Sequence, residues 1–75
     1  MNKGVTRNRL RQFRERSRLS LTEVATLTGF DVSTISKHEN GQRGLTPEAI
    51  TKYAKLYKVE SYELFYLEVV TDSED

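Results

Sequence analysis

The sequence of 75 residues contains no cysteine and no tryptophan, and only one proline and one histidine. Without cysteine the chain can form neither disulfides nor thiolate zinc sites, which suits a reducing compartment, and a lone His38 cannot hold a metal ion by itself. No apolar run approaches the roughly 20 residues that span a bilayer, and the first residues lack the apolar region of a signal peptide. We therefore expect no metal, no cofactor and no membrane segment, and a cytoplasmic location.

Catalytic groups are equally scarce. A nucleophile, a base and an orienting residue cannot be assembled around one histidine in a chain without cysteine, and serine or threonine alone is not a catalytic signal. A chain of this length forms one domain with one small core, which leaves little room for a catalytic cleft. We therefore expect no catalytic residues and a protein that is not an enzyme.

The two ends of the chain carry charges of opposite sign. Residues 1–18 contain seven basic side chains and one acidic side chain, whereas residues 60–75 contain six acidic side chains and no basic one. A basic front and an acidic back are typical of a protein that faces a polyanion with one side. The basic residues either contact a phosphate backbone or form a solvated surface. The acidic tail at residues 71–75 is either solvated or docks a basic partner.

The most informative stretch is residues 21–41, in which a helical period continues on both sides of Gly29. Ala25 lies four residues before this glycine and Ile35 lies six residues after it. A small residue at the contact, a turn residue that tolerates positive φ and a β-branched residue at the junction are what two short helices joined by a tight turn require. The stretch therefore predicts a helix-turn-helix.

Capping residues delimit the two helices of this unit. Ser20 and Glu23 form a capping box before the first helix, which should end at Gly29. Asp31 is a suitable N-cap for a second helix over residues 32–40. The pattern therefore predicts the first residue of each helix to within one or two positions.

Three further helices are expected around the helix-turn-helix, over residues 6–17, 47–57 and 62 to about 67 or 70, from their apolar periodicity. Residues 1–5 show no such periodicity and are predicted to be a flexible arm, which is either disordered or contacts DNA. The whole chain, residues 1–75, is thus predicted to be a single all-α, five-helix domain.

Residues 9–65 contain three ordered stretches, which are L-S-L-T-E-V-A, T-G-F-D-V-S-T-I-S-K-H-E-N-G and L-T-P-E-A-I-T-K-Y-A-K-L-Y-K-V. In these stretches the chain resembles the Cro and phage-repressor helix-turn-helix family, also called the xenobiotic-response-element-like family. The resemblance implies a compact lambda-repressor-like domain that binds double-stranded DNA operators, usually as a homodimer, and regulates transcription as a repressor.

The resemblance also implies roles for individual positions. The residues that match the family's base-contacting face are Val32, Ser33, Ser36 and Lys37. Contacts to the DNA backbone are implied for Thr34, Asn40, Gln42 and Arg43, and the basic start of the chain adds Arg7 and Arg11 as candidates. A structural ion pair between the first helix and the end of the third is implied for Arg14 and Glu39.

Two positions depart from the family pattern. Leu21 stands where the family often has a glutamine that contacts the DNA backbone, so one polar contact is missing and Leu21 is expected to cover the core edge. His38 stands where the family usually has an apolar residue. It is either a buried histidine with its hydrogen bonds satisfied or a pH-sensing or ligand-binding group.

The end of the chain carries more apolar surface than a short helix can bury. We assign the surplus to a homodimer interface, for which the candidates are Tyr62, Phe65, Tyr66 and Val69. Alternatively, some of these residues complete the core and the others lie singly on the surface. The sequence thus predicts a homodimeric repressor that inserts helix 32–40 into the major groove. The alternative is an antitoxin-like or anti-regulator module that binds a protein partner at its acidic end, with secondary DNA binding.

Overall fold

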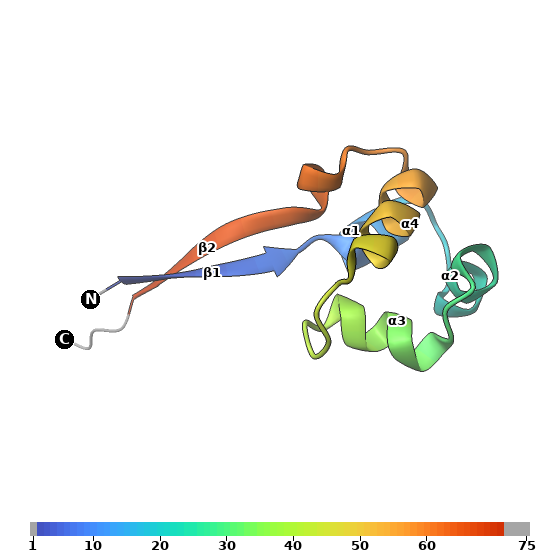
Figure 1. Ribbon diagram of the computed structural model, residues 1–75, viewed down its shortest axis with the longest axis horizontal. Coiled ribbons are helices and arrows are strands. Elements are labelled where there is room, and N and C mark those ends of the chain that lie inside the picture. The colour runs from blue at the N-terminus through green and yellow to red at the C-terminus, as the bar shows by residue number, and fades with distance from the viewer. Residues whose placement is uncertain (1, 72–75) are drawn as a thin grey trace.

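A computed structural model describes residues 2–71 and shows two regions of different shape (Figure 1). A β-ribbon of two strands projects from a helical body, so that the molecule measures 47 × 24 × 23 Å. The ribbon consists of β1 (Asn2–Asn8) and β2 (Phe65–Thr71). The helical body consists of α1 (Leu10–Arg16), α2 (Leu21–Thr28), α3 (Val32–Glu39), α4 (Pro47–Tyr57) and the 3₁₀ helix η1 (Ser61–Leu64).

The caps that were expected from the sequence delimit α2 and α3. Ser20 and Glu23 form the reciprocal capping box of α2, and Gly29 ends that helix in the left-handed conformation with φ of 85°. The side chain of Asp31 accepts a hydrogen bond of 2.7 Å from the backbone N–H of Thr34 at the start of α3. The helix-turn-helix predicted for residues 21–41 is therefore confirmed.

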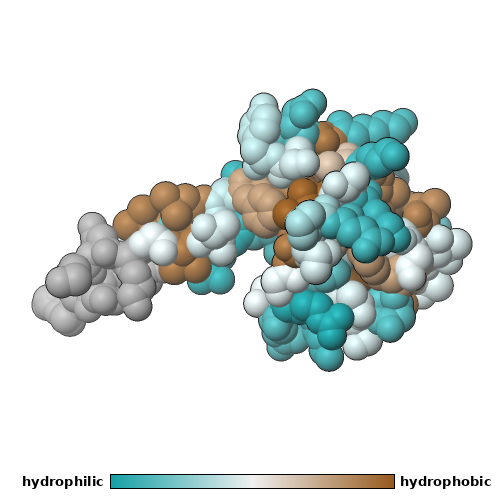
Figure 2. Space-filling view, viewed as in Figure 1, coloured by the Kyte–Doolittle hydropathy of each residue, from teal (hydrophilic) through white to brown (hydrophobic). Residues whose placement is uncertain are grey.

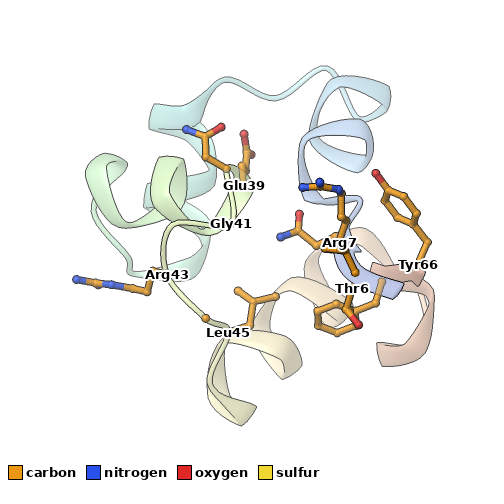
Figure 3. A pocket seen from close by; sticks show the side chains of 12 residues that line it. Thr6, Arg7, Glu39, Gly41, Arg43, Leu45 and Tyr66 are labelled. Atoms are coloured by element: carbon orange, nitrogen blue, oxygen red, sulfur yellow. The ribbon is translucent and has the colours of Figure 1, made fainter. Parts of the chain in front are cut away.

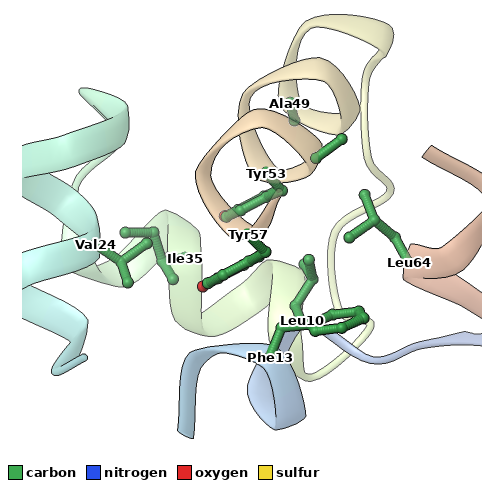
Figure 4. Packing of buried hydrophobic residues seen from close by; sticks show 9 residues of the cluster. Leu10, Phe13, Val24, Ile35, Ala49, Tyr53, Tyr57 and Leu64 are labelled. Atoms are coloured by element: carbon green, nitrogen blue, oxygen red, sulfur yellow. The ribbon is translucent and has the colours of Figure 1, made fainter. Parts of the chain in front are cut away.

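The hydrophobic core lies between the four α-helices and η1 (Figure 4). Each element contributes at least one side chain, and the buried apolar residues are Leu10, Phe13, Val24, Ile35, Ala49, Tyr53, Ala54, Tyr57 and Leu64. The rings of Tyr53 and Tyr57 are stacked with their centroids 6.3 Å apart. The core thus joins α3 to the rest of the body through Ile35, which is completely buried.

The helix predicted for residues 62–70 is wrong, because this segment forms the end of η1 and then the strand β2. Aromatic and β-branched residues dominate the sequence Phe65–Thr71 and pack well on a pleated strand. The strand is completed by antiparallel pairing with β1, in which Asn2 lies opposite Thr71 and Asn8 opposite Phe65. A partner so far away in the sequence leaves no local signal.

The start of the chain also differs from the prediction. Part of the expected arm at residues 1–5 belongs to β1, and the first helix begins at Leu10, several residues later than expected. The described residues therefore form four α-helices, one 3₁₀ helix and a two-stranded sheet, so the five-helix all-α fold is only partly correct. Of the tail at residues 71–75, Thr71 belongs to β2 and residues 72–75 lie outside the described residues.

The separation of the charges along the sequence is not a separation in space. Because β1 and β2 are neighbours, the basic front meets the acidic back, and Arg7 forms an ion pair with Glu68 across the ribbon. No helix within residues 2–71 is both long enough and apolar enough to cross a membrane.

Candidate nucleic-acid interface

The orientation of α3 is fixed by contacts on both sides of the tight turn. The hydroxyl of Thr28 donates to the carbonyl of Val24 and accepts from the backbone N–H of Phe30. The ammonium group of Lys52 on α4 donates a hydrogen bond of 2.9 Å to the carbonyl of Thr28, which satisfies an acceptor at the end of α2. Since Ile35 anchors the inner side of α3, the opposite side of that helix is held facing solvent.

The base-contacting face implied by the family pattern lies on this outer side. Val32, Ser33 and Lys37 are exposed, and Ser36 is half-buried. Residues four positions apart lie along one row of a helix, so the four side chains form two adjacent rows of one surface. Its side chains are short except for that of Lys37, so an approaching surface can come close to the helix backbone.

The residues assigned to the DNA backbone surround the end of α3. Asn40, Gln42 and Arg43 are exposed, and Thr34 is half-buried beneath Arg43, whose guanidinium lies 3.4 Å from the threonine hydroxyl. The guanidinium of Arg11 donates a hydrogen bond of 2.9 Å to the side-chain oxygen of Asn40. Arg11 and Asn40 therefore place polar and basic groups at the C-terminal end of α3, while Arg43 extends from the following loop to the first turn of the helix.

The loop after α3 is closed by backbone hydrogen bonds. The N–H groups of Gln42 and Arg43 both donate to the carbonyl of Lys37, over 2.9 and 3.3 Å, and Gly41 adopts a φ of 74°. This arrangement satisfies carbonyls that would otherwise lack partners at the helix end. It also fixes the position of Arg43 relative to the base-contacting face.

Arg14 and Glu39 form the ion pair between α1 and α3 that the family pattern implied. Two hydrogen bonds of 2.7 and 3.1 Å join the guanidinium to the carboxylate, and a third joins Arg14 to the carbonyl of Leu19. The side chains of Arg14 and Glu39 are only 15% and 2% exposed. The hydrogen bond to Glu39 raises the pKa of Arg14, so the guanidinium stays charged, and the pair ties the end of α3 to α1.

His38 lies on the buried side of α3 and has a hydrogen-bond partner. Its Nδ1 lies 2.8 Å from the hydroxyl of Tyr53, and the ring of Phe30 contacts it edge-on. Burial, followed by the positive charge of Arg43, lowers the pKa of His38. The neutral imidazole is therefore favoured, and His38 supports the interface from behind. Leu21 packs against the core edge, as expected.

The base of the ribbon adjoins the end of α3 and encloses a cleft of about 430 Å³ (Figure 3). Arg7 and Tyr66 line this cleft from the ribbon, and Glu39, Gly41 and Arg43 line it from α3 and the loop that follows. Arg7, a candidate for DNA contact, is already paired with Glu68. Binding a phosphate would require this exposed pair to open.

Asn8 was not identified from the sequence as a functional position. Its side-chain nitrogen donates a hydrogen bond of 2.9 Å to the carbonyl of His38, and its side-chain oxygen accepts from the N–H of Leu10. Asn8 thereby joins the ribbon, α1 and the end of α3. Asn8 precedes the N-cap of α1, Arg9, and its bond to the N–H of Leu10 is the local Asx turn that asparagine favours, a signal that could have identified Asn8.

The residues assigned to a dimer interface do not form one patch. Tyr62 lies on η1 and is 77% exposed, whereas Phe65 packs against the core. Tyr66 is half-buried with the guanidinium of Arg9 over its ring at 4.6 Å, and Val69 is 61% exposed. Since side chains alternate along a strand, Phe65 and Val69 share one face of β2 and Tyr66 lies on the other.

Within residues 2–71 no group of three or more histidine or carboxylate side chains is placed to hold a metal ion. The polar groups at the end of α3 are instead spread over an open surface. Such a surface suits contact with a large polar partner better than enclosure of a small ligand.

Comparison with known proteins gives two matches. Residues 7–64 match the family model described as a helix-turn-helix domain. The HTH-type transcriptional repressor RghR of Bacillus subtilis (strain 168) is 38% identical to this chain over 58 residues, which cover 76% of the chain and 43% of the repressor. The chain therefore spans less than half the length of this relative.

Proposed function

The chain belongs to the helix-turn-helix family, and on this premise we propose that it is a DNA-binding transcriptional regulator without enzymatic activity. It acts as a repressor and binds double-stranded operator DNA as a homodimer, with α3 in the major groove. The observation that carries this proposal is the exposed face of α3, which the core holds outward while polar and basic side chains flank both ends of the helix. The name of the relative RghR supports the role of repressor.

The side chains of α3 contact different groups of the DNA bases. Lys37 donates to the O6 and N7 acceptors of guanine, and Val32 contacts a thymine methyl group. The hydroxyl groups of Ser33 and Ser36 can form hydrogen bonds with several bases, so they discriminate weakly between base pairs. With one long donor on this face, part of the specificity comes from DNA shape and from bridging water.

Affinity comes mainly from contacts to phosphates around the end of α3. Arg43, Asn40 and Gln42 are exposed there, and Arg11 approaches from α1. Neutralising phosphates releases counterions, so the affinity falls steeply with salt. In the homodimer two α3 helices enter successive major grooves about 34 Å apart.

The test is to select bound duplexes from a random pool and to measure affinities for the selected and the random duplex by fluorescence anisotropy. Lys37→Ala should lose about 1–3 kcal/mol of discrimination at one base pair, because a base contact is removed. Arg43→Ala should weaken binding to both duplexes alike, because a phosphate contact is removed. Equal losses on both duplexes for both variants would contradict the role given to Lys37.

The same measurement separates the alternative function of a protein-interaction module. Two of the acidic residues that motivated it have local roles, since Glu63 caps η1 and Glu68 pairs with Arg7. Weak binding to any duplex even at low salt would favour the interaction module over the regulator.

A further inference from the structure

The β-ribbon has two chemically different faces. Because directly opposed residues of an antiparallel pair share a face, the register puts Gly4, Thr6, Leu67 and Val69 together. None of these side chains carries a charge. The opposite face carries the ion pair between Arg7 and Glu68.

The uncharged face, defined by Gly4, Thr6, Leu67 and Val69, is left open to solvent. Leu67 is 67% exposed and Val69 is 61% exposed, although both are apolar. Gly4 has no side chain, and a Cβ there would lie 3.2 Å from Leu67 Cδ1, so Leu67 extends over the opposite strand. The result is a smooth apolar surface, and Figure 2 shows hydrophobic residues gathered along the projecting ribbon.

We propose that the uncharged face of the ribbon packs on the same face of a second copy of this chain. A phosphate backbone or a charged protein surface would lose its solvation against Leu67 and Val69 without gaining a partner of opposite charge. An identical uncharged face has no such cost, and a two-fold axis makes the contact self-complementary. This contact would be the interface of the homodimer in the proposed function. The distance between the two copies used below rests on that proposed function.

The reach of the ribbon fits a second copy on neighbouring DNA. Seven residues per strand span roughly 23 Å at about 3.3 Å per residue. The ribbon leaves the body beside the end of α3, where Asn8 is bonded to the carbonyl of His38. Two α3 helices about 34 Å apart are each about 17 Å from the midpoint between them. Each ribbon is therefore long enough to meet its partner there.

The size of the face sets the strength of the contact. Two strands about 5 Å apart and roughly 23 Å long present a face well below the ~800 Å² per partner of a standard stable interface. The dimer is therefore weak in free solution, and binding to neighbouring half-sites strengthens it by holding two copies close together.

The absence of cysteine from the chain permits a direct test by disulfide trapping. Leu67→Cys and Val69→Cys place a single thiol on the uncharged face, and the matched control Glu68→Cys places it on the opposite face of the same strand. In concentrated protein under mild oxidation, without DNA, the first two should form covalent dimers several-fold faster than the control. Equal rates, or a faster reaction of Glu68→Cys, would overturn the proposal.

A charge on the uncharged face provides the second measurement. Sedimentation velocity should show that Leu67→Lys lowers the dimer fraction at high concentration, and circular dichroism should show an unchanged helical signal because Leu67 lies outside the core. An unchanged dimer fraction would overturn the proposal. Binding of the protein to duplex DNA is measured separately. DNA binding without association of two copies through Leu67 refutes the ribbon contact alone. Association of two copies without DNA binding refutes the proposed function alone.

Discussion

The helical body and the β-ribbon obtain their stability from different sources. The body surrounds nine buried apolar side chains and contains a buried ion pair, whereas the ribbon consists of one backbone ladder that leaves Leu67 and Val69 exposed. A two-stranded ribbon alone is at best marginally stable in water, so this one depends on the body at its base and, in our proposal, on a second copy along its length. One short chain can therefore use its helical body to fold and, in our proposal, its ribbon to associate with a second copy.

The test with the largest expected effect compares an Arg–Glu pair of the body with an Arg–Glu pair of the ribbon. Arg14→Ala should lower the free energy of unfolding by up to about 3–5 kcal/mol, because the buried side chain of Glu39 loses two hydrogen bonds and keeps the more distant Arg11, 3.7 Å away. Arg7→Ala should cost no more than about 1 kcal/mol, because the ribbon pair is half-exposed. Chemical denaturation followed by circular dichroism measures both. Similar losses for the two variants would erase the distinction between the regions.

The next test compares two leucines three positions apart. Leu64→Ala should lower the free energy of unfolding by about 2–5 kcal/mol, because Leu64 is completely buried and the change leaves a cavity. Leu67→Ala should change it by about 0.5 kcal/mol or less in dilute solution, where the ribbon face is open. Thermal unfolding at low concentration checks this pair. A large loss from Leu67→Ala would mean that the ribbon packs on the body.

A smaller effect is expected within the body, at its two buried tyrosines. Tyr53→Phe should cost about 1–3 kcal/mol, because His38 loses its partner. The hydroxyl of Tyr57 has no partner among the described residues, and burial raises the pKa of Tyr57 to about 12. Tyr57→Phe should therefore leave the free energy of unfolding unchanged or raise it by up to about 1 kcal/mol. Denaturant titrations of both variants measure the difference, and a larger loss from Tyr57→Phe would reverse this assignment.

The smallest expected effect is a dependence on mild acid. Burial lowers the pKa of His38 in the folded chain, so the unfolded chain binds a proton more readily below the ordinary value of about 6.5. Stability should be full above about pH 6.5 and should fall as the pH drops toward the lowered pKa of His38. Unfolding at a series of pH values above the carboxylate range measures this slope. His38→Gln should flatten it, and an unchanged slope would assign it to another group.

The sequence was sufficient for the helix-turn-helix because its signals are local. The capping box of Ser20 and Glu23 and the turn at Gly29 depend on residues a few positions apart. Ile35 was likewise expected at the junction of the two helices, and it is buried there. The residues assigned to DNA contact came from the resemblance to the family, and their roles stay predictions.

The ribbon could not be predicted in the same way. The ladder of β1 requires β2, which lies at the other end of the sequence, and the aromatic residues of β2 also suited a short helix. The bond from Asn8 to the carbonyl of His38 and the pair of Arg7 with Glu68 depend on that ladder, so they were missed as well. The pair of Arg14 and Glu39 was expected only because the chain resembles its family.

The pairing of the two ends of the chain also sets an order of folding. The helical body lies between β1 and β2 in the sequence, so the ribbon cannot form until the helices and β2 have been synthesised. The two strands must also be brought close together. The folded helical body achieves this, because the backbone N–H of Arg9 donates a hydrogen bond of 2.7 Å to the carbonyl of Leu64. β1 therefore waits for its partner until the helical body that separates the two strands has been made and folded.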